Sequence, residues 1–129
     1  MRLRAGFIAL AVVALAACGA DVSTQRAGGT VMMAIPSKPK AFNLAIIGGT
    51  LMRTEQGCLA SGTTADPAVV QFPFGSELSA DGQSVEVPDF GTLRLGDTFQ
   101  GGGGMGDLAY ITGVPVECQT GTSFISWQS

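Results

Sequence analysis

Few residues in this sequence could perform acid–base or nucleophilic chemistry. The chain has no histidine, which excludes Ser–His and Cys–His nucleophilic systems and nearly all familiar catalytic zinc sites. Lys38 and Lys40 lie in a stretch that we expect to be flexible, so a buried catalytic lysine is not expected. What remains for catalysis is a carboxylate pair, as in glycoside hydrolysis. The acidic candidates are Glu77, Asp81, Glu86, Asp89, Asp97 and Asp107.

The spacing of these acidic residues favours structural roles over catalysis. Nothing in it fixes two carboxylates at the separation of about 5 to 9 Å that glycoside hydrolysis requires. Most of them lie in predicted turns, where Asp accepts hydrogen bonds from nearby backbone amides and stays solvated. The alternating oxygen ligands and distant Glu of a calcium loop are also missing. We therefore expect no catalytic residue, no metal site and no cofactor.

A run of glycines from Gly101 to Gly106, interrupted only by Met105, formally matches the GxGxxG pattern of dinucleotide-binding folds. That pattern needs a preceding strand, a long helix after it and a βαβ unit. The sequence predicts no such helix, so we interpret the run as a flexible or tightly turned loop. Alternatively, the exposed amides of this loop contact a ligand. The residues in contact would then be Gly102, Gly103, Gly104 and Asp107, beside Tyr110 as the most exposed aromatic ring.

The chain has three cysteines, and their positions suggest one separate cysteine and one pair. Cys18 lies at the end of an N-terminal apolar segment, whereas Cys58 and Cys118 lie far apart in the remaining chain. In an oxidising compartment, two such thiols predict one disulfide. Because there is no CxxC motif and no histidine, a redox-active or metal-binding pair is the less favoured alternative.

The first 17 residues have the pattern of a secretory signal peptide. Arg2 and Arg4 precede an apolar stretch of about 13 residues, which is too short for the roughly 20 helical residues that cross a bilayer. Leu15-Ala16-Ala17-Cys18 then resembles the lipobox of bacterial lipoprotein precursors. The resemblance implies diacylation of the Cys18 thiol, cleavage before Cys18, and often acylation of the new amine. An ordinary signal peptide with a coincidental cysteine, or a short uncleaved anchor, is the alternative.

Cleavage there would leave a small acidic chain. Losing Arg2 and Arg4 leaves five basic residues against ten acidic ones, which gives a net charge of about −5. Such a surface is unsuited to nucleic acid and would be repelled by anionic lipid. We therefore expect the acyl chains on Cys18 to hold the protein at the membrane, and we expect no nucleic-acid partner.

The remaining sequence predicts a tether followed by one β-domain. Residues 18–40 are rich in small and polar residues, with Pro36 and Pro39, and are interpreted as the lipidated cysteine and a flexible tether. Thr30 to Ile35 could instead form a strand. The domain is expected to span residues 41–129 and to hold the disulfide. Its short apolar runs predict strands at 43–53, 58–61, 68–74, 84–87, 92–95, 98–100 and 122–128.

Short strands in a chain of this size favour an all-β fold. Asp81-Gly82 is the clearest turn, and residues 107–111 could form one helical turn. Gly48-Gly49, inside the first long strand, predicts a bend or bulge. We expect a small single-domain β-barrel like those that bind oligonucleotides and oligosaccharides, and a β-sandwich is the alternative. We expect most aromatic side chains to be needed for the core.

Scattered motifs from residue 57 to residue 118 carry a second resemblance. They are Gly57-Cys58-Leu59, Phe72-Pro73-Phe74-Gly75, Leu93-Arg94-Leu95-Gly96-Asp97, Gly101 to Gly104, and Cys118. In this order they are similar to a group of small exported β-domains of GC-rich bacteria, especially actinobacteria, often carried on lipoproteins. The resemblance implies a compact β-fold in the cell envelope. It implies no catalytic residues, because no activity is assigned to that group.

These observations predict a lipid-anchored lipoprotein on the extracytoplasmic face of the cell membrane, or in the outer membrane of a Gram-negative cell. We expect it to act as a non-catalytic module that binds an envelope protein. A module that binds a glycan or a small molecule is the first alternative. A carboxylate-dependent hydrolase of cell-wall polymers is the second.

Overall fold

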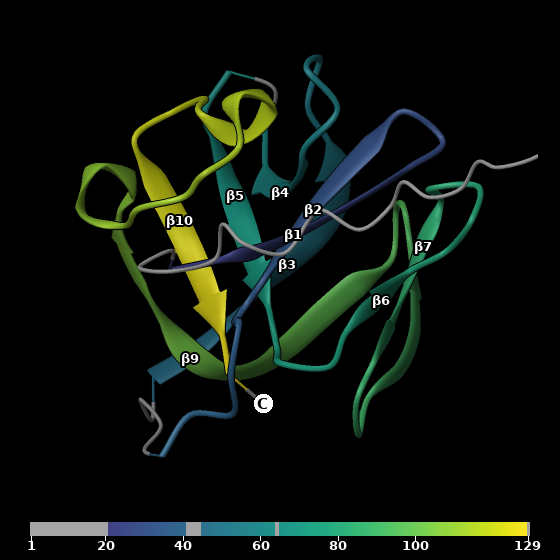
Figure 1. The fold of residues 1–129 in the computed structure, drawn as a ribbon, viewed down its shortest axis with the longest axis horizontal. Helices are drawn as coiled ribbons and strands as arrows, with labels where there is room; N and C mark the ends of the chain where they lie inside the picture. Colours follow the sequence, from purple (N-terminus) through teal and green to yellow (C-terminus); the bar gives the residue numbers. More distant parts are fainter. Residues whose placement is uncertain (1–20, 41–44, 64, 129) are drawn as a thin grey trace, which may run out of the picture.

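The computed structural model describes residues 21–40, 45–63 and 65–128, and these residues form an all-β domain (Figure 1). A seven-stranded sheet has the order β1-β2-β5-β10-β9-β3-β4, and a separate three-stranded sheet has the order β6-β7-β8. Within the described residues, helical structure is limited to two short 3-10 turns, η2 (Leu108–Tyr110) and η3 (Val116–Cys118). The predicted helical turn after Asp107 and the all-β class are both confirmed.

The larger sheet closes on itself. β3 (Ala45–Arg53), β4 (Leu59–Gly62), β5 (Pro67–Phe72), β9 (Thr98–Asp107) and β10 (Ser123–Trp127) form a ring, because β4 and β5 also pair with each other. Four neighbouring pairs in this ring are antiparallel, and β10 runs parallel to β5. The small β-barrel expected from the sequence is confirmed, and it has five strands.

The paired glycines in β3 lie where this strand changes neighbours. Residues 45–50 pair with β9, and residues 51–53 pair with β4. A Cβ atom on Gly48 would lie 2.4 Å from the carbonyl oxygen of Phe99, and one on Gly49 would lie 2.0 Å from the hydroxyl oxygen of Ser61. The register with β9 is unbroken, so the glycines serve a close approach of strands and not a bulge.

The predicted tether is wrong over residues 23–34. β1 (Ser23–Ala27) and β2 (Thr30–Ala34) form a hairpin, and β2 pairs in parallel with β5. Gly28 and Gly29 have φ angles of 57° and 79°, as a two-residue hairpin turn requires. All five residues of β2 are buried, so the strand suggested as an alternative at residues 30–35 is confirmed over residues 30–34. Apolar residues facing both sides of the strand explain why this segment joins the domain.

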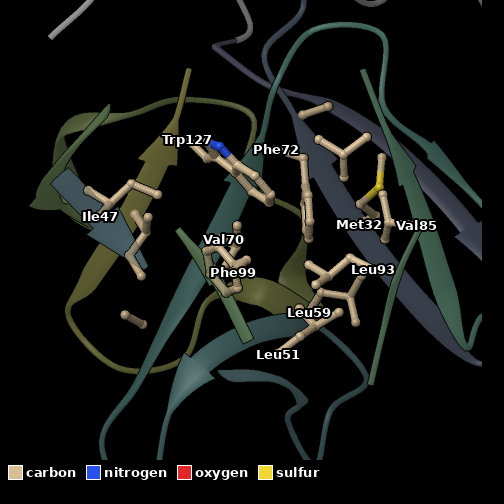
Figure 2. Packing of buried hydrophobic residues seen from close by; sticks show 14 residues of the cluster. Met32, Ile47, Leu51, Leu59, Val70, Phe72, Val85, Leu93, Phe99 and Trp127 are labelled. Atoms are coloured by element: carbon tan, nitrogen blue, oxygen red, sulfur yellow. The ribbon is translucent and has the colours of Figure 1, made fainter. Parts of the chain in front are cut away.

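The second sheet lies between β5 and β9 in the chain. It contains β6 (Glu77–Leu78), β7 (Ser84–Val87) and β8 (Gly91–Arg94), all antiparallel. The Asp81-Gly82 turn links β6 to β7, as the sequence predicts, and Gly82 has a φ angle of 74°. The sheet contributes Val85, Val87 and Leu93 to the core inside the barrel (Figure 2).

Trp127 is the centre of that core. Its ring stacks on Phe99 at 4.9 Å between centroids, and it also contacts Phe72 at 5.9 Å. Phe90 meets it edge-on at 5.2 Å from the second sheet. The expectation that most aromatic residues serve the core is confirmed for Phe72, Phe99, Phe124 and Trp127, which are all buried.

Candidate functional site

The connection from β9 to β10 forms a strap across the outside of the barrel. We define the strap as residues 108–118, which include η2 and η3. Its partly buried residues Leu108, Ile111 and Val114, with buried Cys118, pack against a second apolar cluster on the outer face of the sheet. The strands contribute Val31, Met33, Ala60, Val69 and Phe124 to that cluster. The strap therefore encloses a core of its own.

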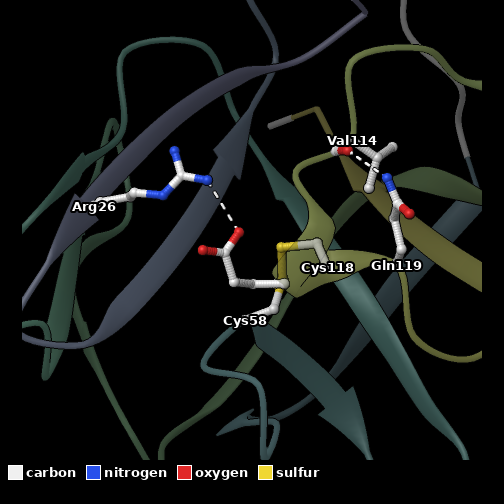
Figure 3. A network of polar contacts seen from close by, with 6 residues as sticks. Arg26, Cys58, Val114, Cys118 and Gln119 are labelled. Carbon is white, nitrogen blue, oxygen red and sulfur yellow. Dashed lines mark hydrogen bonds and ion pairs between the residues drawn. A yellow bond between two sulfur atoms is a disulfide. The ribbon is translucent and has the colours of Figure 1, made fainter.

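The strap is fixed at three places, two of which are drawn in Figure 3. Cys118 forms a disulfide with Cys58, which confirms the predicted pairing. Glu117 forms an ion pair with Arg26 of β1, at 2.9 Å. At the other end, the Asp21 amide donates to the Thr112 carbonyl, and the Thr112 amide donates to the Asp21 carboxylate. Residues far apart in the sequence thus hold the strap down.

This arrangement covers a face that some other small β-barrels use for ligands. In barrels that bind oligonucleotides and oligosaccharides, the face of the second and third strands is the usual binding surface. The equivalent strands here are β4 and β5, and their outward residues Ala60 and Val69 are buried in the cluster beneath the strap. That face is therefore closed in this structure.

The ion pair on the strap lowers the pKa of its carboxylate. The guanidinium of Arg26 donates to the carboxylate of Glu117 and lowers its pKa below the ordinary value of 4.5. Independently, hydrogen bonds from the Ser79 hydroxyl and the Gln83 amide lower the pKa of Asp81. Asp81 is exposed and Glu117 is partly exposed, and in each case the hydrogen-bonding partner is the main cause of the lower pKa.

We expect Arg26→Gln to raise the pKa of Glu117 toward 4.5 while leaving that of Asp81 unchanged. A carboxylate whose pKa is lowered by folding contributes stability above its unfolded pKa and loses it as the pH falls through the folded value. The contribution of Glu117 at neutral pH should therefore disappear in the variant. A carbon-detected NMR titration of the side-chain carboxyls measures both groups. An unchanged Glu117 curve would show that the ion pair does not form in solution.

The glycine run is not a loop. Gly102, Gly103 and Gly104 lie inside β9, paired with β3 on one side and β10 on the other. A Cβ atom on Gly103 would lie 1.9 Å from the carbonyl oxygen of Ser126, and one on Gly106 would lie 2.8 Å from the ring of Phe124. The predicted loop is therefore wrong: the run belongs to a strand, and Gly103 lets β9 and β10 approach closely.

The other two predicted binding residues lie at the start of the strap. Tyr110 is 84% exposed, which confirms it as an exposed ring. The carboxylate of Asp107 accepts a hydrogen bond from the Ala109 amide at the beginning of η2. Asp107 also lines a shallow hollow of about 480 Å³ in this region, together with Leu108, Ala109, Ile111, Gly113, Val114, Gln119, Gly121 and Thr122. The glycines of β9 do not line it.

A groove at the other end of β10 was missed by the sequence analysis. It has a volume of about 390 Å³ and is lined by Lys38, Pro39, Pro73, Phe74, Gly75, Pro88, Asp89 and Gln128. Its lining is mainly apolar, with one lysine and one aspartate. Thr122 lies in the strap hollow and Gln128 in this groove. The five residues of β10 therefore separate the two by roughly 17 Å.

Two phenylalanines in turns are half-exposed in this region, Phe74 in the groove and Phe90 in the neighbouring hollow of the second sheet. Phe74 is 47% exposed and lines the groove, while Phe90 is 43% exposed and lies one residue beyond Asp89. Asp89 has a φ angle of 64°, the one positive φ of a non-glycine residue in the described ranges. The Phe90 amide closes the turn onto Val87. Turns normally place Gly or Asn at such a position. The sequence feature that could have indicated these two turns is a Phe-Gly pair that follows a proline in both, in Pro73-Phe74-Gly75 and Pro88-Asp89-Phe90-Gly91.

Two candidate carboxylates do meet in the second sheet. Glu77 of β6 and Glu86 of β7 are cross-strand partners, and with Asp89 they line a shallow hollow of about 490 Å³. Both glutamates are exposed, whereas a general acid of a glycosidase needs surroundings that retain its proton at neutral pH.

Across the described ranges there is no group of three or more Asp, Glu, His or Cys residues placed to hold a metal ion.

No family model, curated protein or solved structure matches this chain. The resemblances to lipoprotein precursors and to small exported domains therefore stay predictions from the sequence. Among the described residues, no helix has the length and apolar character needed to cross a bilayer. Residues 1–20, which include the predicted signal peptide and Cys18, lie outside the described residues.

Proposed function

We propose that this protein is a lipoprotein of the bacterial cell envelope that acts by binding another protein. In this proposal Cys18 carries the acyl chains, and the barrel presents a binding surface to a partner. One acyl chain gives only marginal membrane affinity, whereas two or three anchor a protein firmly. Because the mature chain has a net charge of about −5, lipidation and not surface charge would supply the attachment.

The observation that carries the protein-binding proposal is the half-exposed ring of Phe74 in the groove, with the half-exposed ring of Phe90 in the neighbouring hollow. Aromatic rings are enriched at the centres of protein interfaces, where they supply large contact areas. Phe74 lines an apolar groove. Lys38 and Asp89 line the same groove and could make polar contacts with a partner. An aspartate in a strained backbone conformation is also more frequent at functional positions than elsewhere. The partner would insert an apolar side chain beside Phe74.

The alternatives have weaker support. A glycan-binding role at the usual face of such barrels conflicts with the strap that covers it. A hydrolase would need Glu77 and Glu86 to differ in protonation, yet both side chains are exposed and solvated. A non-catalytic module fits these observations best.

Photo-crosslinking in living cells tests the proposed binding surface. A photoreactive amino acid would replace Phe74 in the full-length lipidated chain, and captured proteins would be identified by mass spectrometry. The matched control places it at Ile46, which is 75% exposed on β3. We expect one dominant protein from position 74, absent from position 46, and lost when Lys38→Glu is added. Capture of the same proteins from both positions, or of none, would refute the proposed surface.

A further inference from the structure

We infer that the strap end of this domain rests on the lipid bilayer, with Tyr110 among the lipid headgroups and the Phe74 groove facing away. The inference rests on the proposed anchor at Cys18. It concerns how a domain held by that anchor is oriented, which the anchor by itself does not determine.

The first argument is the length of chain between the anchor and the strap. Asp21 is hydrogen-bonded to Thr112 through its backbone amide, at 3.0 Å, and through its carboxylate, at 2.8 Å from the Thr112 amide. Only Gly19 and Ala20 separate Cys18 from Asp21. Three residue steps span at most about 11 Å. Lipid attached to Cys18 must therefore lie close to the strap.

The residue that follows Asp21 limits the movement of this connection. Val22 is buried in the cluster beneath the strap, and β1 begins at the next residue. A tether of about 20 residues would have allowed the domain to reach roughly 25 Å from the membrane and to rotate freely. The folded hairpin removes that freedom. Covalent reach therefore keeps the part of the strap around Thr112 near the membrane.

The second argument is the chemistry of the surface brought there. Residues 108–116 contain no charged side chain. They include Tyr110, 84% exposed, and Val116, 74% exposed, and Met105 of the adjoining β9 is 65% exposed. Tyrosine is favoured at the membrane–water interface, because its ring is apolar and its hydroxyl can stay hydrated. The nearby carboxylates of Asp21, Asp107 and Glu117 already have partners, which are Thr112, the Ala109 amide and Arg26.

The orientation also suits the proposed function. The groove lies at the far end of β10, about 17 Å from the strap hollow. A domain resting on its strap would therefore present Phe74 and Asp89 to the space beyond the membrane. The acidic residues of the second sheet, Glu77 and Glu86, would also lie away from anionic headgroups.

Paramagnetic relaxation in lipid nanodiscs tests this orientation. The lipidated chain, isotopically labelled, would be placed in discs of phosphatidylcholine and phosphatidylglycerol that contain a gadolinium-chelating lipid. Paramagnetic relaxation of an amide falls with the sixth power of its distance from the gadolinium ion. The groove lies about 17 Å farther from the membrane than the strap in the proposed orientation. Amide relaxation should therefore be more than about tenfold stronger at residues 108–116 than at residues 89–91. Tyr110→Asp should lower the strap values at least about twofold, because a charged side chain there weakens the contact. Phe74→Asp, the matched control, should not change them.

A maximum at residues 89–91, or equal relaxation over the whole surface, would overturn the proposed orientation. The intact mass of the same sample shows separately whether Cys18 is lipidated. If the mature chain isolated from cell membranes lacks acyl chains, the proposed anchor fails. If it carries them and the strap shows no excess relaxation, only the orientation fails.

Discussion

Replacing Cys58 and Cys118 together by alanine is expected to lower the free energy of unfolding by about 4 kcal/mol. The disulfide closes a loop with a sequence separation of 60 residues, and opening it returns conformational freedom to the unfolded chain. Both sulfur atoms also belong to the buried cluster beneath the strap. For a domain of this size, the loss is a large share of the net stability.

Urea denaturation monitored by Trp127 fluorescence measures this loss, in a Cys18→Ser background that removes the third thiol. Dithiothreitol provides the control, because it should destabilise the parent protein and leave the double variant unchanged. A double variant within about 1 kcal/mol of the parent would contradict the result expected for a closed loop of this length. It would mean that the apolar packing of the strap, with its bonds to Arg26 and Asp21, holds it without the disulfide.

Gly103→Ala is expected to destabilise the barrel by at least about 3 kcal/mol, at the upper end of the cost of overpacking. The new Cβ atom would lie 1.9 Å from the carbonyl oxygen of Ser126 in the paired strand β10. Because that oxygen belongs to the backbone, no side-chain rotation relieves the contact. Strands β9 and β10 would have to separate beside Trp127.

The matched control is Gly29→Ala, in the turn between β1 and β2. Gly29 has a φ angle of 79°, and a Cβ atom there would meet nothing within 4 Å. The control therefore carries only the cost of a positive φ, about 1 to 2 kcal/mol. Urea denaturation of both variants gives the comparison. If Gly103→Ala is no more destabilising than Gly29→Ala, the glycines of β9 are not needed for close strand packing.

The barrel was predictable because its strands carry their own local signals. Short apolar runs separated by Gly and Pro predicted the ends of most strands to within two or three residues, and Asp81-Gly82 predicted a turn. The two wrong predictions of local structure both concern glycine-rich segments. Gly28-Gly29 was predicted to be part of a flexible tether but forms a hairpin turn. Gly101 to Gly104 were predicted to form a loop but lie in strand β9. In both cases tertiary contacts outweigh local propensity.

Less of the candidate site could be predicted. The pairing of Cys58 with Cys118 followed from counting cysteines, and Tyr110 was expected to be exposed because it lies next to the glycine run. The strap and the groove could not be predicted, because each joins residues distant in the sequence. The bonds between Asp21 and Thr112, and the approach of Lys38 to Phe74 and Asp89, depend on how the hairpin docks on the barrel.

The intact mass of the mature protein, extracted from the membranes of the cells that make it, tests the central claim most directly. The account predicts a chain that begins at Cys18, carries two or three acyl chains and partitions with the membrane. Cys18→Ala should abolish both the added mass and the membrane association. A chain with an unmodified Cys18, recovered free of membrane, would contradict the anchor and with it the proposed function.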